Sequence, residues 1–96
     1  MPKTTKFDVA DYLDNPEIIR EYLNEALATK DEKYIAKAIG IVARAKGMTE
    51  IAAAAGLGRE SLYKSFGGET NPEFGTVQKV LDAMDFELEV KPKAAA

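Results

Sequence analysis

The feature that most constrains this sequence is a series of closely spaced helix-start and helix-stop signals. Asn15-Pro16 combines a capping side chain with a proline at the first helical position, where its missing N–H costs nothing. Asp31 and Thr49 can cap two further helices. Stop signals follow at Gly47, Gly56 and Gly67-Gly68. Signals at this spacing leave room only for short helices, and a length of 96 residues allows a single compact domain over 1–96.

Apolar residues recur at helical spacing between these signals. We therefore expect five helices, over residues 15–28, 31–46, 49–55, 59–66 and 73–84. The expected core-facing residues are Ile18, Ile19, Tyr22, Leu23, Ala26 and Leu27 in the first helix, Ile35, Ala38, Ile39, Val42 and Ala43 in the second, and Phe74, Val77, Val80, Leu81 and Met84 in the last. Gly40 interrupts the second helix at a cost of about 1 kcal/mol relative to alanine. Close packing of a neighbouring helix is one reason for a glycine there.

The end of the chain has a different periodicity. Residues 86–91 alternate strictly between apolar and charged side chains, which predicts a short β-strand that ends at Pro92. A lone strand leaves its backbone groups unpaired. Three partners are compatible with the sequence: residues 7–9 of the same chain, a second copy of the chain, or the sheet edge of another protein. An extended tail packed over the helices is the unpaired alternative, and we favour pairing in a symmetric homodimer.

Charge is distributed unevenly along the chain. Residues 1–32 carry four basic and eight acidic side chains, a net charge of −4. Residues 33–67 carry six basic and two acidic ones, a net of +4, and residues 68–96 carry three and six, a net of −3. A basic middle between acidic flanks suggests one anionic and one cationic partner. Sampling alone also produces fluctuations of a few charges in segments of this length.

The composition disfavours catalysis and metal binding. The chain has no Cys and no His, so it lacks a thiol nucleophile, a zinc-finger ligand set and the usual general base. Asp8, Asp11 and Asp14 lack the spacing and glycine of a calcium loop. Gly56 and Gly58 lack the third glycine and preceding strand of a dinucleotide site. We therefore expect no enzyme, no cofactor and no metal, and the absence of a signal sequence or an apolar span predicts a cytoplasmic protein.

Residues 48–67 have the pattern of a helix-turn-helix. Ala52 is small where two short helices would cross, and Gly56 lies at the turn, where a positive φ is required. Leu57 would fill the space under the turn. Core-facing residues are expected at Ile51, Ala55, Leu62 and Phe66.

The second helix of this pair would direct charged and polar side chains outward. They are Arg59, Glu60, Ser61, Tyr63 and Lys64. Side chains at the N-terminal end of such a helix reach base edges in the major groove, and arginine can bind guanine with two hydrogen bonds. The alternative is a corner between two core helices with an ordinary solvated face. We take Thr49, Gly58, Arg59, Glu60, Ser61, Tyr63 and Lys64 as candidate DNA-binding residues.

The sequence resembles a known family over nearly its whole length. The matching segments are residues 8–13, 15–17, 47–52, 56–64, 71–72 and 76–81, and the Arg-Glu-Ser-Leu-Tyr-Lys run at 59–64 is the most specific. They are similar to addiction-module antidote (antitoxin) proteins with a helix-turn-helix of the Cro/lambda-repressor (XRE) type. Two positions depart from the family pattern: Gly58 replaces a frequent capping serine, and residues 52–55 are all alanine where other members have polar residues.

Combined with the helices and the strand predicted above, the resemblance implies an all-α, five-helix, lambda-repressor-like domain with a short C-terminal strand. It also implies an antitoxin that neutralises a RelE/ParE-like toxin, and a dimer that represses its own operon. On charge, the acidic segment 1–32, including the outer face of helix 15–28, is our first choice for the toxin-binding surface. Two alternatives remain open: a stand-alone repressor of the same fold, and a protein-only inhibitor that has lost DNA binding.

Overall fold

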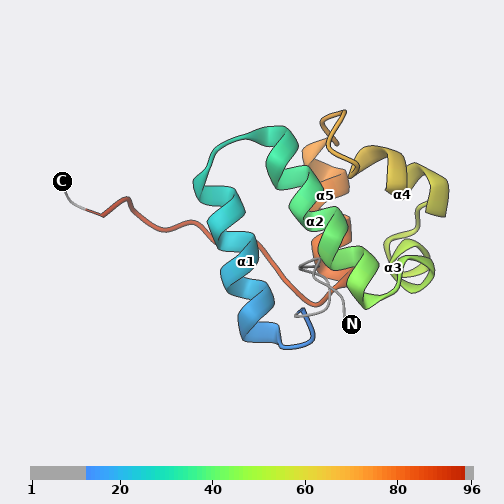
Figure 1. Cartoon of the computed structure of the whole chain (residues 1–96), viewed down its shortest axis with the longest axis horizontal. Coiled ribbons are helices and arrows are strands. Elements are labelled where there is room, and N and C mark those ends of the chain that lie inside the picture. The colour runs from blue at the N-terminus through green and yellow to red at the C-terminus, as the bar shows by residue number, and fades with distance from the viewer. Residues whose placement is uncertain (1–12, 95–96) are drawn as a thin grey trace, which may run out of the picture.

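The computed structural model describes residues 13–94 of the chain, and these residues form five helices (Figure 1). In chain order the helices are α1 (Pro16–Ala28), α2 (Glu32–Lys46), α3 (Met48–Ala55), α4 (Arg59–Ser65) and α5 (Phe74–Ala83). The predicted all-α class and the predicted order of helices are therefore confirmed. A helix able to cross a bilayer would have to be longer and more continuously apolar than any formed by residues 13–94.

Two of the three predicted N-caps are confirmed. The Asn15 side chain accepts hydrogen bonds from the backbone N–H groups of Glu17, at 2.8 Å, and Ile18, at 3.4 Å. Asp31 accepts bonds from the N–H groups of Lys33 and Tyr34 in the same way, at 3.1 and 3.2 Å. Each cap provides partners for N–H groups that the first turn of a helix cannot satisfy internally.

The predicted cap at Thr49 is wrong. Gly47 is the single residue between α2 and α3, and its φ of 114° both ends the first helix and redirects the chain into the second. Because α3 already begins at Met48, Thr49 lies inside its first turn and cannot act as a cap. No side chain makes a capping hydrogen bond at the start of α3.

Helix α2 lies at the centre of the fold, in contact with α1, α3, α4 and α5. The core residues predicted for it are buried or nearly so. Gly40 is buried on α2 where the helix meets the end of α4, and a side chain there would overlap the carbonyl oxygen of Phe66. The expected reason for this glycine, close packing of a neighbouring helix, is thus confirmed.

Three residues predicted to face the core are exposed instead. Phe74 is 66% exposed, Ile18 44% and Leu27 38%. Phe74 is the first residue of α5, and burial on that helix is confined to its second half, at Val80 and Leu81. Helix α1 packs mainly against the single helix α2, so only a narrow stripe of its apolar residues is covered.

The predicted C-terminal strand is also absent from the described residues. Residues 86–91 are neither helix nor strand, because nothing in residues 13–94 lies alongside them to complete a ladder of hydrogen bonds. Phe86 packs against the core, whereas residues 87–94 are exposed. The alternative partner at residues 7–9 lies outside the described residues.

We predict that Gly40→Ala destabilises the protein by about 1–3 kcal/mol, because the added methyl group forces α2 away from the end of α4. The measurement is chemical denaturation followed by circular dichroism. Gly75→Ala is the matched control, since a Cβ at that exposed helical position meets nothing within 4 Å. The control should gain about 0.5–1 kcal/mol from helix propensity. Equal effects of the two substitutions would contradict the close approach at Gly40.

Candidate nucleic-acid interface

The turn between α3 and α4 is closed by its own backbone. Gly56 adopts a left-handed conformation, with φ 72°. The N–H of Leu57 donates to the carbonyl oxygen of Ala52 at 2.9 Å, and that of Gly56 donates to Ala53 at 3.2 Å. This pair of bonds is the Schellman arrangement for ending a helix at glycine. Leu57 packs under the turn against the core, as predicted.

The inner sides of α3 and α4 are tightly held. Ile51 and Ala52 are buried on α3, and Leu62 and Phe66 are buried on α4 and at its end. Ala55 is half-buried and packs against the same core. All of these residues face inward as the sequence predicted. Helix α4 has only seven residues, so its orientation depends on this packing more than on its own stability.

The outer side of α4 brings together the residues predicted to face outward. Arg59, Glu60, Ser61, Tyr63 and Lys64 are all exposed. Gly58 directly precedes α4, and Thr49 is exposed in the first turn of α3. No side chain caps α4 at Gly58, as expected from the lack of a serine there.

One interaction on this surface was not predicted. The Arg59 guanidinium carbon lies 5.7 Å from the centre of the Tyr63 ring, within the range of a cation–π contact. The i, i+4 spacing of an arginine and a tyrosine on a helix is the sequence signal that could have revealed it. This contact limits the directions in which the Arg59 side chain can extend.

Glu60, Ser61, Tyr63 and Lys64 lie together on one open surface of α4. All four residues belong to the same helix, so no second element of residues 13–94 contributes to this surface. A convex helix surface of this kind suits contact with a large partner better than enclosure of a small substrate. Within residues 13–94, His, Cys, Asp and Glu side chains form no group able to hold a metal ion.

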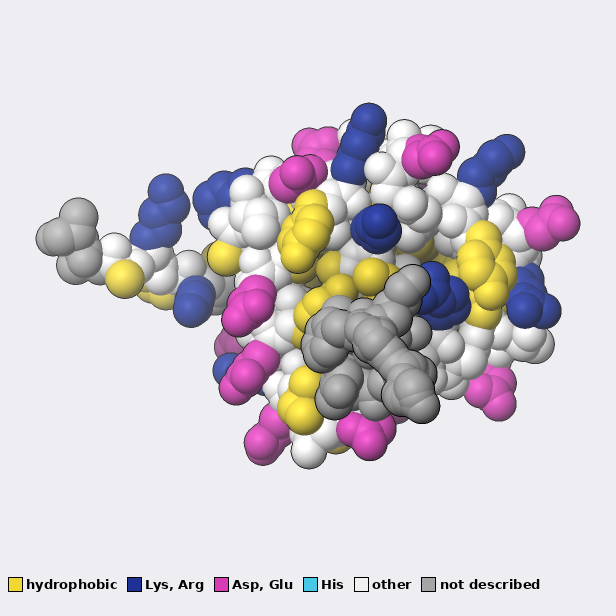
Figure 2. All heavy atoms as spheres, viewed as in Figure 1, with side chains coloured by type: hydrophobic (Ala, Val, Ile, Leu, Met, Phe, Trp, Pro, Cys, Tyr) yellow, Lys and Arg dark blue, Asp and Glu magenta, His cyan; other side chains and the backbone are white. Residues whose placement is uncertain are grey.

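The charges predicted from the sequence are on separate helices of the fold. Glu17, Glu21 and Glu25 are exposed at i, i+4 and i+8 on α1, and they form what we call the acidic face of α1. Lys33, Lys37 and Arg44 are exposed on α2. Figure 2 shows acidic side chains along the α1 side of the molecule, and basic side chains interspersed with acidic ones over α2 and towards α4.

One titratable group with a shifted pKa lies between α1 and α2. Burial raises the pKa of the Tyr22 phenol above its usual value of 10.0, the nearby Tyr34 adds to the rise, and Arg44 opposes it. All three side chains come from α1 and α2. The shift therefore reflects how closely these two helices pack, and it does not mark a chemical group on α4.

Comparison with known proteins shows the family. The model of a family described as "probable addiction module antidote protein" matches residues 3–92, so the chain belongs to that family. It is also 45% identical over 85 residues to a protein of Haemophilus influenzae described as uncharacterized, and the match covers 88% of each chain. No solved structure matches the chain significantly.

We predict that Gly56→Ala lowers the free energy of unfolding by about 1–2 kcal/mol, because alanine resists the left-handed conformation that ends α3. A Cβ at Gly56 meets nothing within 4 Å, so no steric clash adds to this cost. Gly56→Asn is the comparison, because asparagine tolerates this conformation better than alanine does. Denaturation of both variants would check the prediction, and a loss with asparagine as large as with alanine would contradict it.

Proposed function

We propose that this member of the antidote family is the antitoxin of a type II toxin–antitoxin module. In this proposal it neutralises a RelE/ParE-like toxin and represses its own operon through a helix-turn-helix of the XRE type. The observation that carries the proposal is the exposed, cation-bearing surface of α4, held by a closed turn in a chain of the antidote family. The protein acts by binding its partners, without catalysis, in the cytoplasm where both partners would be found.

In this proposal α4 enters the major groove of operator DNA. Arg59 reads a guanine edge, and Ser61, Tyr63 and Lys64 contact bases or phosphates. Thr49 and Gly58 flank the same groove, where a hydroxyl and an exposed backbone N–H suit phosphate contacts. The basic side chains of α2 add attraction to DNA that does not depend on base sequence.

The acidic face of α1 is the proposed toxin-binding surface. It complements a basic toxin in charge, and opposite charges speed association and disfavour incorrect partners. In Figure 1, α1 and α4 lie on opposite sides of α2. The toxin and the operator therefore have different surfaces available to them.

The protein acts in this proposal as a homodimer. Helix-turn-helix proteins commonly bind two half-sites about 34 Å apart, or at multiples of that spacing, so their operators have two-fold symmetry. A dimer also doubles the number of contacts with DNA. A single α4 of seven residues would provide few.

We predict that Arg59→Ala weakens binding to the operator by about 1–3 kcal/mol and relaxes the preference at one base position. The measurement is a fluorescence-anisotropy titration with the DNA upstream of the gene and with variants of it. Arg20→Ala is the matched control, because it removes the same charge from an exposed position on α1. The affinity of the control should remain close to that of the wild type.

The salt dependence of the same titration tests the alternatives. Unchanged affinity of the Arg59 variant would remove Arg59 from the base-reading set. Absence of any salt-dependent binding to upstream DNA would reject DNA binding and favour a protein-only inhibitor.

We predict that the double substitution Glu17→Lys with Glu21→Lys weakens binding to the toxin encoded beside the gene by roughly tenfold or more, because it places positive charge opposite a basic surface. The measurement is calorimetry with the purified toxin. Glu69→Lys with Glu73→Lys is the control, because it makes the same change in charge at exposed positions next to α5.

A control that weakens binding as much as the α1 variant would contradict the assignment of the surface. Absence of any toxin-like reading frame beside the gene would reject the antitoxin role, and would favour a stand-alone repressor.

A further inference from the structure

The C-terminal segment 87–94, which we call the tail, has backbone and side chains without partners in the fold. Every residue of the tail is exposed, and Val90 is 96% exposed. None of the backbone hydrogen bonds described for residues 13–94 involves a tail residue. In Figure 1 the tail passes α1 and leaves the helical body. An extended segment with free backbone groups is able to pair with another strand.

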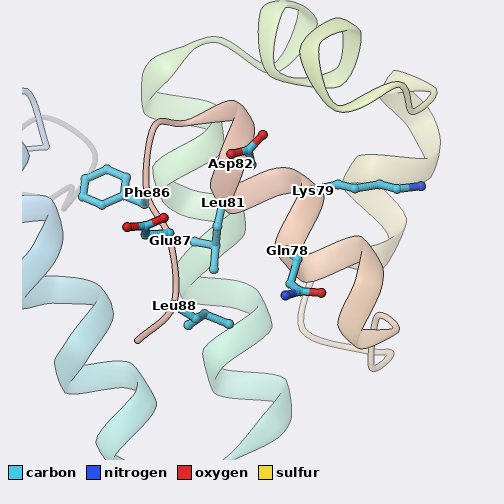
Figure 3. Close-up of a pocket in the computed structure, with 7 residues that line it drawn as sticks. All are labelled: Gln78, Lys79, Leu81, Asp82, Phe86, Glu87 and Leu88. Atoms are coloured by element: carbon cyan, nitrogen blue, oxygen red, sulfur yellow. The ribbon is translucent and has the colours of Figure 1, made fainter. Parts of the chain in front are cut away.

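The start of the tail is fixed to the body of the protein. Asp85 is in the left-handed conformation, with φ 67°, and its N–H donates to Asp82 at 2.9 Å. The N–H of Phe86 donates to the carbonyl oxygen of Leu81 at 2.9 Å, and its ring packs against the core. Figure 3 shows Leu81 pointing from α5 towards the tail, over the groove that Leu88 also lines. The tail therefore leaves α5 from a defined position.

The charges of the tail are arranged symmetrically about one residue. Even-numbered positions from Phe86 to Ala94 are apolar, and all four odd-numbered positions are charged. Glu87 and Glu89 precede Val90, and Lys91 and Lys93 follow it. A segment with acids before its midpoint and bases after it is complementary to its own copy in the antiparallel direction.

We propose that the tails of two copies of this chain pair as an antiparallel β-ribbon centred on Val90, and that this ribbon is a dimer interface. In this register Glu87 lies opposite Lys93 of the second copy, and Glu89 lies opposite its Lys91. The two-fold axis repeats both pairs, so all eight charged side chains have partners of opposite charge. Facing pairs of opposite charge stabilise a sheet, and facing like charges destabilise it.

Other registers are less favourable. A shift of two residues in either direction places Glu89 opposite Glu89, or Lys91 opposite Lys91. A shift of one residue places a charged side chain opposite an apolar one on the wrong face of the ribbon. Only the register centred on Val90 pairs every charge with its opposite.

The backbone independently indicates which edge of the tail makes the hydrogen bonds, and this edge is compatible with the register centred on Val90. Alternate residues of an antiparallel strand direct their N–H and C=O groups to the partner strand. Pro92 has no N–H, and the N–H of Phe86 is already bonded to Leu81, so the even-numbered residues are the ones that face away. The odd-numbered residues, which carry the charges, then make the hydrogen bonds. Proline is tolerated in this position because its ring lies on the outer edge of the ribbon.

A second copy fits the tail better than the alternatives do. Residues 13–94 contain no strand with which the tail of the same chain could pair. A second copy necessarily has the complementary charge pattern, whereas a different partner need not have it. The tail and α4 lie at opposite ends of the molecule in Figure 1, so pairing of the tails leaves α4 uncovered. The proposal rests on the homodimer of the proposed function and names its interface. It does not depend on binding of DNA or toxin, so the operator and toxin titrations are decided separately from the test below.

The test uses two charge-reversed variants of the full chain in sedimentation equilibrium without DNA or toxin. Glu87→Lys with Glu89→Lys gives a tail of four lysines, and Lys91→Glu with Lys93→Glu gives a tail of four glutamates. The wild type is expected to dimerise, and each variant alone to dimerise at least about tenfold more weakly, because every facing pair becomes repulsive. An equimolar mixture of the two variants is expected to recover the wild-type dimer affinity.

The double variant Glu69→Lys with Glu73→Lys is the control, because it makes the same change in charge at exposed positions outside the tail. It should dimerise as the wild type does. Circular dichroism would verify that the helices of every variant are intact. A wild type that stays monomeric up to about 1 mM, reversed variants as dimeric as the wild type, or no recovery on mixing would each overturn the proposal.

Amide hydrogen exchange tests which edge of the tail makes the hydrogen bonds of the ribbon. In the dimer the amides of residues 87, 89, 91 and 93 should be protected, and those of residues 88, 90 and 94 should exchange rapidly. Protection of the opposite set would overturn pairing through the odd-numbered residues. Protection that develops only after toxin is added would overturn the homodimer ribbon and assign the tail to the toxin.

Discussion

The close approach of α2 to the end of α4 is the contact on which the rest of this structure depends. Gly40 has no side chain, so the backbone at Phe66 can pack directly on α2. Phe66 itself is buried, and together with Leu62 it ties the short helix α4 to the core. Because α2 also contacts α1, α3 and α5, a displacement at Gly40 would reach every other helix. The orientation of the exposed surface of α4 therefore depends on this contact.

Much of this fold could be predicted from local signals. Asn15 and Asp31 act as caps through hydrogen bonds to residues two or three positions away, so the sequence contains all the necessary information. Gly56 and its Schellman turn are local in the same sense. Thr49 was wrongly assigned because the choice between Gly47 and Thr49 as the boundary depends on how sharply the chain turns between α2 and α3. That angle is a property of tertiary packing.

The remaining differences between the predictions and the structure concern which segments pack or pair with each other. Strict alternation wrongly predicted a strand over residues 86–91, because alternation cannot say whether a neighbouring strand exists, and residues 13–94 contain none. Phe74 and Ile18 are apolar at helical spacing and are nevertheless exposed, because burial depends on which neighbouring helix reaches them. For the candidate interface, the outward residues of α4 were predicted as a group. The contact between Arg59 and Tyr63 was missed because spacing on a helix allows such a contact without requiring it.

The net charge of −3 is an average over surfaces that the fold keeps apart. Acidic side chains line α1 and basic ones line α2 and α4, with α2 between the other two. If α1 binds the toxin and α4 the operator, as proposed, neither partner has to leave for the other to bind. Binding of one partner changes the affinity for the other only if it alters the interactions that the second partner makes. With the two surfaces apart, such an effect would have to pass through α2 or act through long-range charge. A basic toxin on α1 would also offset negative charge that repels DNA, so the complex should bind the operator at least as well as the antitoxin alone.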